Sequence, residues 1–241
     1  MTPELVLLFT TVASVAFFHT VMGPDHYVPF IALGKNKSWS LQKTCWVVFA
    51  CALGHAIGSI LLGAVGIYFG LELPALTSFE GNRGVLAAWA MIAFGLIYGS
   101  WGLKKSFLRR PHEHWHVHDG IFHTHQHVHD DKHRHIHYPT HLDKRDSSAW
   151  ALFIIFVLGP CEPLIPLMML PAVNESVIGV IGVIGVIVIF FLVTLITMLG
   201  VVIIGFNGLN RARFDVISRY GSTLTGGSIA ACGLLVIIFE I

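Results

Sequence analysis

Six stretches of the sequence are apolar for about twenty residues or more, and this feature limits the fold more than any other. They cover residues 5–33, 44–71, 84–103, 147–172, 176–206 and 220–239. A bilayer core is about 30 Å thick and each helical residue adds about 1.5 Å, so roughly 20 apolar residues cross it as a helix. Only 12% of the residues are charged, which is low for a soluble domain. The sequence therefore predicts an all-α polytopic membrane protein with six transmembrane helices.

The basic residues predict how this chain is oriented. All fifteen Lys and Arg except Arg83 lie in the connections 35–43, 104–145 and 211–219, which follow the first, third and fifth apolar stretches. Basic residues accumulate on the cytoplasmic side of a membrane. We therefore expect both termini outside, a cytoplasmic loop over 104–146, and a location in a bacterial inner membrane.

Two short echoes indicate an internal repeat. The sequence GPDH at 23–26 returns as GPCE at 159–162, and Gly-Leu at 95–96 returns at 233–234. The offsets of about 136 and 138 residues are similar, so three helices per half predict an inverted 3+3 repeat, as in many transporters. The repeats are residues 1–103 and 147–241, separated by the loop. Because proline removes a helix donor, the first and fourth helices should break, at Gly23, Pro24, Pro160 and Pro163.

A few metal-binding side chains interrupt the apolar stretches: His19, Asp25, His26, His55, Cys161 and Glu162. An ionised carboxylate at mid-membrane costs on the order of 3 kcal/mol, so such groups usually face a partner, a cavity or an ion. Imidazole with some carboxylate or thiolate suits nickel, cobalt, zinc or copper. The alternative is that each group only binds backbone freed by the prolines. That alternative weighs as much as metal binding for His55, and Cys161 is more typical of packing than of ligation.

The loop is dominated by histidine. Twelve of the fifteen histidines lie in the loop, mostly as His-x-His, and the other three are at positions 19, 26 and 55. Alternate residues of an extended chain face the same way, so these imidazoles can chelate in pairs. A merely solvated linker would not need histidine, and we predict metal binding without metal selectivity. The residues concerned are His112, His114, His116, His118, His123, His125, His127, His129, His133, His135, His137 and His141.

Three motifs resemble the nickel/cobalt exporter and UreH-like (NicO type) membrane family, within the superfamily of lysine exporters and CcdA-like proteins. They are HTVMGPDHYVPF at 19–30, GHAIGS at 54–59 and the histidine-rich loop, and the segment GPCEPLIPLMMLP is similar to the superfamily's half-helix. The resemblance implies six or seven spans, divalent metal transport, and ligation by His19, Asp25 and His26. Nickel/cobalt transporters typically have His-x4-Asp-His, whereas five residues separate His19 from Asp25 here.

We therefore expect a secondary transporter, an exporter of nickel or cobalt with zinc as the next candidate, and no enzymatic activity. No nucleotide-binding motif of the GxxxxGK[ST] type occurs, so an ion gradient or a partner should drive transport. The expected partners are lipid, metal ions and either a second copy of the chain or a metallochaperone, with no nucleic acid. Two alternatives stay open: a CcdA-type thiol–disulfide electron carrier, and a metal-storage accessory protein for urease or hydrogenase maturation.

Overall fold

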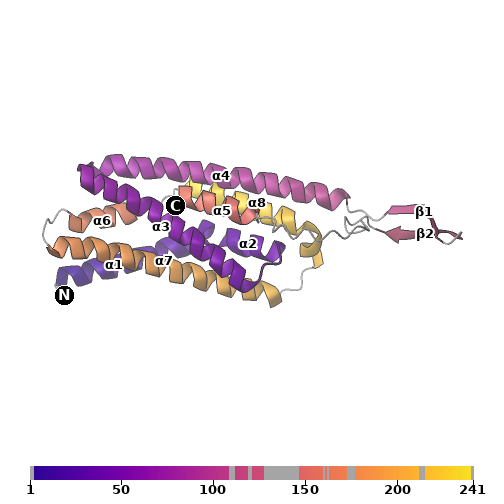
Figure 1. The fold of residues 1–241 in the computed structure, drawn as a ribbon, viewed down its shortest axis with the longest axis horizontal. Helices are drawn as coiled ribbons and strands as arrows, with labels where there is room; N and C mark the ends of the chain where they lie inside the picture. The colour runs from indigo at the N-terminus through magenta and orange to yellow at the C-terminus, as the bar shows by residue number, and fades with distance from the viewer. Residues whose placement is uncertain are drawn as a thin grey trace, which may run out of the picture.

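The structure is a computed structural model that describes residues 3–108, 112–118, 121–127, 147–159, 161, 163–172, 177–211 and 215–239. These residues form a long helical bundle with a β-hairpin at one end (Figure 1). The elements in chain order are α1 (Pro3–Met22), η1 (Pro24–His26), α2 (Val28–Asn36), α3 (Leu41–Phe69), α4 (Leu73–Leu108), β1 (His112–His118), β2 (Ile121–His127), α5 (Ser147–Leu158), α6 (Leu164–Ala172), α7 (Val177–Arg211) and α8 (Asp215–Phe239).

Five helices in the described ranges are long and apolar enough to cross a membrane: α1, α3, α4, α7 and α8. Only 17% to 33% of their most apolar windows is buried inside the protein. Large apolar side chains such as Leu7 (69% exposed), Ile97 (69%) and Ile204 (74%) cover the outside of the bundle. A water-soluble protein rarely exposes apolar surface on this scale. The chain is an integral membrane protein, as predicted.

The fourth predicted helix, at 147–172, is divided into α5 with 12 residues and α6 with 9. Twelve helical residues rise only about 18 Å, which is less than the hydrocarbon thickness. The first predicted helix is divided in the same way, into α1 and α2, with a 3-10 turn between them. Both interruptions therefore fall where proline and glycine predicted them.

The third helix differs from its prediction because it begins at Leu73 and not near residue 84. Glu80 and Arg83 consequently lie inside α4, although the sequence placed Arg83 in a connection on the outer face. The bundle is all-helical, as predicted, and the loop adds a hairpin in which β1 and β2 pair as antiparallel strands. Their register sets His112 opposite His127 and His116 opposite His123.

Helices α4 and α8 cross in close backbone contact. A methyl group at Gly226 would overlap the Gly99 nitrogen and the Gly95 oxygen, and one at Gly95 would lie 2.6 Å from the Gly226 oxygen. Small residues at such positions let membrane helices approach until their backbones touch. Elsewhere in the bundle, α1 packs against α7, and α3 packs against both α5 and α7.

Candidate metal centre

The break after α1 brings two of the predicted residues together. His19 lies in the last turn of α1, where its carbonyl still accepts a bond of 3.0 Å from the Gly23 amide. His26 lies in η1, and its ring centre is 5.0 Å from that of His19. A Cβ at Gly23 would come within 2.6 Å of His26 Nδ1 and 2.8 Å of Asp25 Oδ1. Glycine at this position therefore lets the Asp25 and His26 side chains fold over the break.

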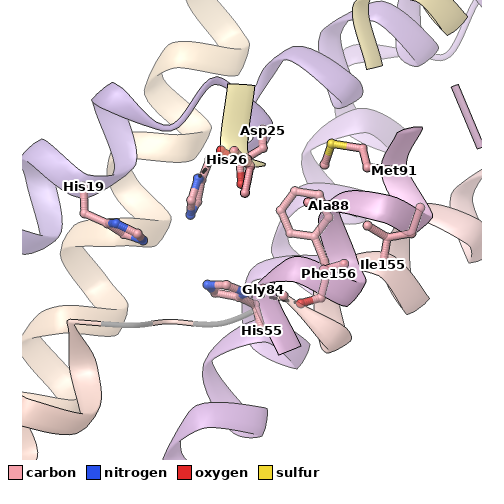
Figure 2. Close-up of a pocket in the computed structure, with 12 residues that line it drawn as sticks. His19, Asp25, His26, His55, Gly84, Ala88, Met91, Ile155 and Phe156 are labelled. Atoms are coloured by element: carbon pink, nitrogen blue, oxygen red, sulfur yellow. Dashed lines mark hydrogen bonds and ion pairs between the residues drawn. The ribbon is translucent and has the colours of Figure 1, made fainter. Parts of the chain in front are cut away.

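A third imidazole comes from α3, far away in sequence. The ring of His55 is 5.7 Å from that of His26, and only 5% of the residue is exposed. Figure 2 shows the imidazoles of His19, His26 and His55 pointing into one common space. The sequence left the role of His55 open, and the fold now places it beside the residues of the first break.

Hydrogen bonds on the far side of two rings determine which nitrogen is available for binding. His55 Nδ1 lies 3.2 Å from the carbonyl oxygen of Phe156, and His26 Nδ1 lies 3.2 Å from Asp25 Oδ1. A carbonyl or carboxylate oxygen only accepts, so each Nδ1 carries the hydrogen. In the neutral form of each ring, Nε2 then has the lone pair. Histidines that bind metals are commonly oriented by such a bond from the other ring nitrogen.

All three Nε2 atoms, those of His19, His26 and His55, are buried without a hydrogen-bond partner among the residues that the structure describes. Most buried side-chain nitrogens and oxygens in native proteins have a partner. Three such atoms in one place therefore share a need for a partner that the described residues do not supply.

These side chains and Asp25 line a cavity of about 40 Å³, which exceeds the ~10–15 Å³ that one water molecule needs. The rest of its wall is mostly apolar and includes Ala87, Ala88 and Met91 of α4 and Ile155 and Phe156 of α5 (Figure 2). An apolar wall leaves the imidazoles and the carboxylate as the groups that can interact with a cation there.

The distances between the ring centres are close to those of two imidazoles that bind one metal ion. Two imidazoles bound through Nε2 to one tetrahedral ion at ~2.0–2.1 Å have ring centres about 5 Å apart, compared with 5.0 and 5.7 Å here. In the described ranges, no three His, Cys, Asp or Glu side chains are yet placed to hold a metal ion. An ion bound by all three imidazoles would require the rings to turn until their Nε2 atoms meet at one point.

Other predicted residues lie elsewhere. Cys161 does not line the cavity, because its side chain packs in an apolar cluster with Val12, Leu164 and Phe190. Pro163 lies in the turn that leads into α6. Pro160 and Glu162 lie outside the described residues, as do His129, His133, His135, His137 and His141. The other seven loop histidines belong to β1 and β2.

Sequence reasoning missed an ion pair next to this cavity. Arg83 Nη1 donates to Glu80 Oε1 at 2.6 Å, and Glu80 is only 1% exposed. Their spacing of three residues in an otherwise apolar helix was the available signal. It was overlooked because the predicted helix began at residue 84.

Comparison with known proteins adds no relative. The chain matches no protein-family model, no curated protein and no solved structure. The geometry of the site is therefore the basis for assigning a function.

Proposed function

We propose that the chain is a secondary transporter of divalent transition-metal ions, nickel or cobalt first, that works as an exporter. The observation that carries this proposal is the set of three buried imidazole nitrogens without partners, which face one small cavity beside Asp25. Nitrogen donors with one carboxylate suit nickel, cobalt and zinc better than calcium or magnesium. A polar site between apolar helices is where transporters bind their substrates. The resemblance to nickel/cobalt exporters agrees with this chemistry.

The helix contacts support an inverted repeat with six crossings, in which α1–α2 and α5–α6 are the equivalent broken helices. Helix α1 packs against α7, and its equivalent α5 packs against α3, the equivalent of α7. In the same way α2 contacts α8, and α6 contacts α4. Exchanging the two halves therefore returns these pairs of neighbours, as a two-fold axis between them requires, whereas the α3–α4 and α4–α5 contacts have no comparable counterpart among the described residues.

The α4–α8 crossing supports the repeat at the level of atoms. A Cβ at Gly95 would meet the Gly226 oxygen and the Ala230 nitrogen, and a Cβ at Gly233 would meet the Ala88 oxygen and the Ile92 nitrogen. Gly233 is 138 positions after Gly95, and 226 and 230 are 138 positions after 88 and 92. The contacts thus repeat with the offset that the sequence echo predicts.

Aromatic residues support a membrane boundary at the hairpin end of the bundle. Trp46, Trp101 and Trp150 are 65%, 53% and 51% exposed and lie near the ends of α3, α4 and α5 that lead to or from the basic connections. Tryptophan is enriched at membrane interfaces, and basic residues at the cytoplasmic one. We infer that the hairpin is cytoplasmic and collects metal for export, and that the chain lies in a bacterial inner membrane with both termini outside.

Flux measurements in proteoliposomes test the proposal. The parent protein should move nickel or cobalt, and Asp25→Asn should lower the initial rate by about 10- to 100-fold, because the carboxylate orients His26 as an outer partner of a metal ligand does. The control is Glu4→Gln, which neutralises an exposed carboxylate in the first turn of α1. Equal flux in the parent and Asp25→Asn would show that the assigned site is wrong.

Deleting the loop distinguishes a transporter from a storage protein. Replacing residues 112–141 with a flexible Gly/Ser linker should leave flux at saturating metal unchanged, because every cavity-lining residue that the structure describes belongs to the helical bundle. Flux at low metal should fall, because the metal-collecting histidines are gone. The measurement is the initial rate against metal concentration. A variant that folds but moves no metal at any concentration would favour the storage function.

A further inference from the structure

The ion pair of Glu80 and Arg83 has no role in the proposed transport so far. Glu80 is 1% exposed and the Arg83 side chain 15%, inside a helix whose other neighbours are largely apolar. Burying an ion pair seldom stabilises a protein relative to apolar side chains, because desolvation offsets the attraction. A stability role alone therefore does not explain why two charged residues occupy these positions.

Both side chains bind the backbone of the break between α5 and α6. Arg83 Nη2 donates to the carbonyl oxygens of Val157 at 3.0 Å and Gly159 at 3.3 Å. The Cys161 amide donates to Glu80 Oε2 at 3.1 Å. Arg83 thus supplies donors for the last carbonyls of α5, and Glu80 accepts from an amide just before α6. These are the backbone groups that a helix interruption leaves without partners.

A hydroxyl from α3 completes the network. Ser59 Oγ donates to Glu80 Oε2 at 3.3 Å and accepts from the Cys161 amide at 3.1 Å. Gly58, the residue before Ser59 in α3, makes room for the guanidinium, because a Cβ there would come within 2.8 Å of Arg83 Nη2. Three segments, α3, α4 and the α5–α6 break, are therefore joined at one buried point.

The same turn of α5 orients a residue of the metal cavity. His55 Nδ1 is bonded to the Phe156 oxygen, next to the Val157 oxygen that Arg83 holds. Gly159, whose carbonyl Arg83 also binds, and Gly84, which follows Arg83 in α4, both line the cavity. Moving the end of α5 would therefore move the acceptor that directs His55 Nε2 into the cavity.

We propose that Glu80 and Arg83 are positioning residues of the metal site, which fix the broken end of α5 and, through the Phe156 carbonyl, the direction of His55 Nε2. This inference rests on the proposed metal site. The ion pair belongs to the first repeat and the α5–α6 break to the second. The ion pair therefore positions the site through a contact between the two halves. The metal affinity of the site should depend on it, as affinity depends on the outer partners of metal ligands.

Equilibrium nickel binding to the full-length protein tests the proposal without requiring transport. The His55→Ala variant serves as reference, and the difference between it and the parent isolates the intramembrane site from the hairpin. Glu80→Gln, Arg83→Gln and the double variant should each weaken nickel binding at this site by about 10- to 100-fold. Binding is measured on the monodisperse fraction, so that loss of folded protein does not count. Glu72→Gln, at an exposed residue just before α4, is the matched control and should bind as the parent does.

Exchanging the two charges provides a sharper test. Glu80→Arg with Arg83→Glu keeps an ion pair three residues apart in α4 but presents a carboxylate to the Val157 and Gly159 oxygens. Affinity should stay low, whereas recovery to the parent value would show that the ion pair alone matters and would overturn the proposal. The milder Ser59→Ala variant removes one partner of the Cys161 amide and should weaken binding less than Glu80→Gln.

Alkylation of Cys161 gives a second measurement that needs no metal. Cys161 is 1% exposed, and its amide is bound by Glu80 and Ser59. Loosening the α5–α6 break should therefore raise the reaction rate of the Cys161 thiol with N-ethylmaleimide at least about tenfold. Unchanged rates and unchanged nickel affinity in the Gln variants would each overturn the proposal. A parent that binds nickel at this site but carries no flux would instead refute the proposed transport and leave the positioning role standing.

Discussion

Replacing His26 with alanine should abolish metal transport, lowering the initial rate of nickel and cobalt flux into proteoliposomes by more than about 100-fold. This residue lies between the other two imidazoles, 5.0 Å from the ring of His19 and 5.7 Å from that of His55. Outer partners of metal ligands already contribute about 10- to 100-fold to affinity or activity, and a ligand should contribute more. Removing His26 also leaves the Asp25 carboxylate without the ring that it binds.

The control for this variant is His114→Ala, which removes one of many histidines in the loop and should leave flux within about twofold of the parent. Both variants must be compared at equal amounts of reconstituted, monodisperse protein. His55→Ala should resemble His26→Ala, because its Nε2 faces the same cavity. If His26→Ala and His55→Ala both fold and move metal at the parent rate, the three imidazoles are not a transport site.

Replacing Gly226 with alanine should prevent stable folding, or lower the free energy of unfolding by at least about 3 kcal/mol. Overpacking typically costs about 1–3 kcal/mol when side chains can yield. Here the added methyl group would overlap the Gly99 nitrogen and the Gly95 oxygen, which belong to the backbone of α4. Only a separation of α4 from α8 would relieve the overlap, and these helices form the largest contact in the bundle.

The neighbouring glycine is a matched control. Gly227 is exposed, and a Cβ there would meet no atom within 4 Å. Gly227→Ala should therefore be neutral or stabilise the helix by up to about 1 kcal/mol. Thermal unfolding in detergent and the yield of monodisperse protein measure both effects. Similar stability in the two variants would mean that α4 and α8 do not touch at Gly226.

The helix breaks illustrate what local sequence can predict. Proline lacks the amide hydrogen that a helix needs, and this holds wherever the helix packs. The interruptions at Pro24 and before α6 could therefore be predicted from the residues alone. The positions of the membrane helices can also be predicted from local hydropathy, because every turn of such a helix contacts lipid or another helix. The predicted start of the third helix was wrong, because Glu80 and Arg83 resemble a polar boundary in the sequence. In the structure the two side chains pair with each other within the bundle.

The partners of the polar side chains could not be predicted from the sequence. Nothing local to His55 shows that its ring meets the break of the first helix, or that the carbonyl of Phe156, a hundred residues later, directs it. The repeat aligns Cys161 with Asp25, and yet its side chain lies in an apolar cluster, as the packing interpretation expected. Sequence spacing specifies neither the rotation of a helix nor its neighbours.

The sequence by itself determined which stretches are apolar, where proline interrupts them and which side chains could bind a metal. Each of these follows from the chemistry of a few adjacent residues. The tertiary structure alone decided that His19, His26 and His55 share a cavity, that Cys161 does not, and that Glu80 and Arg83 hold the second break. The physical reason is that these relations depend on the rotation and crossing of helices from both halves of the chain. Close packing determines the positions of all these helices together.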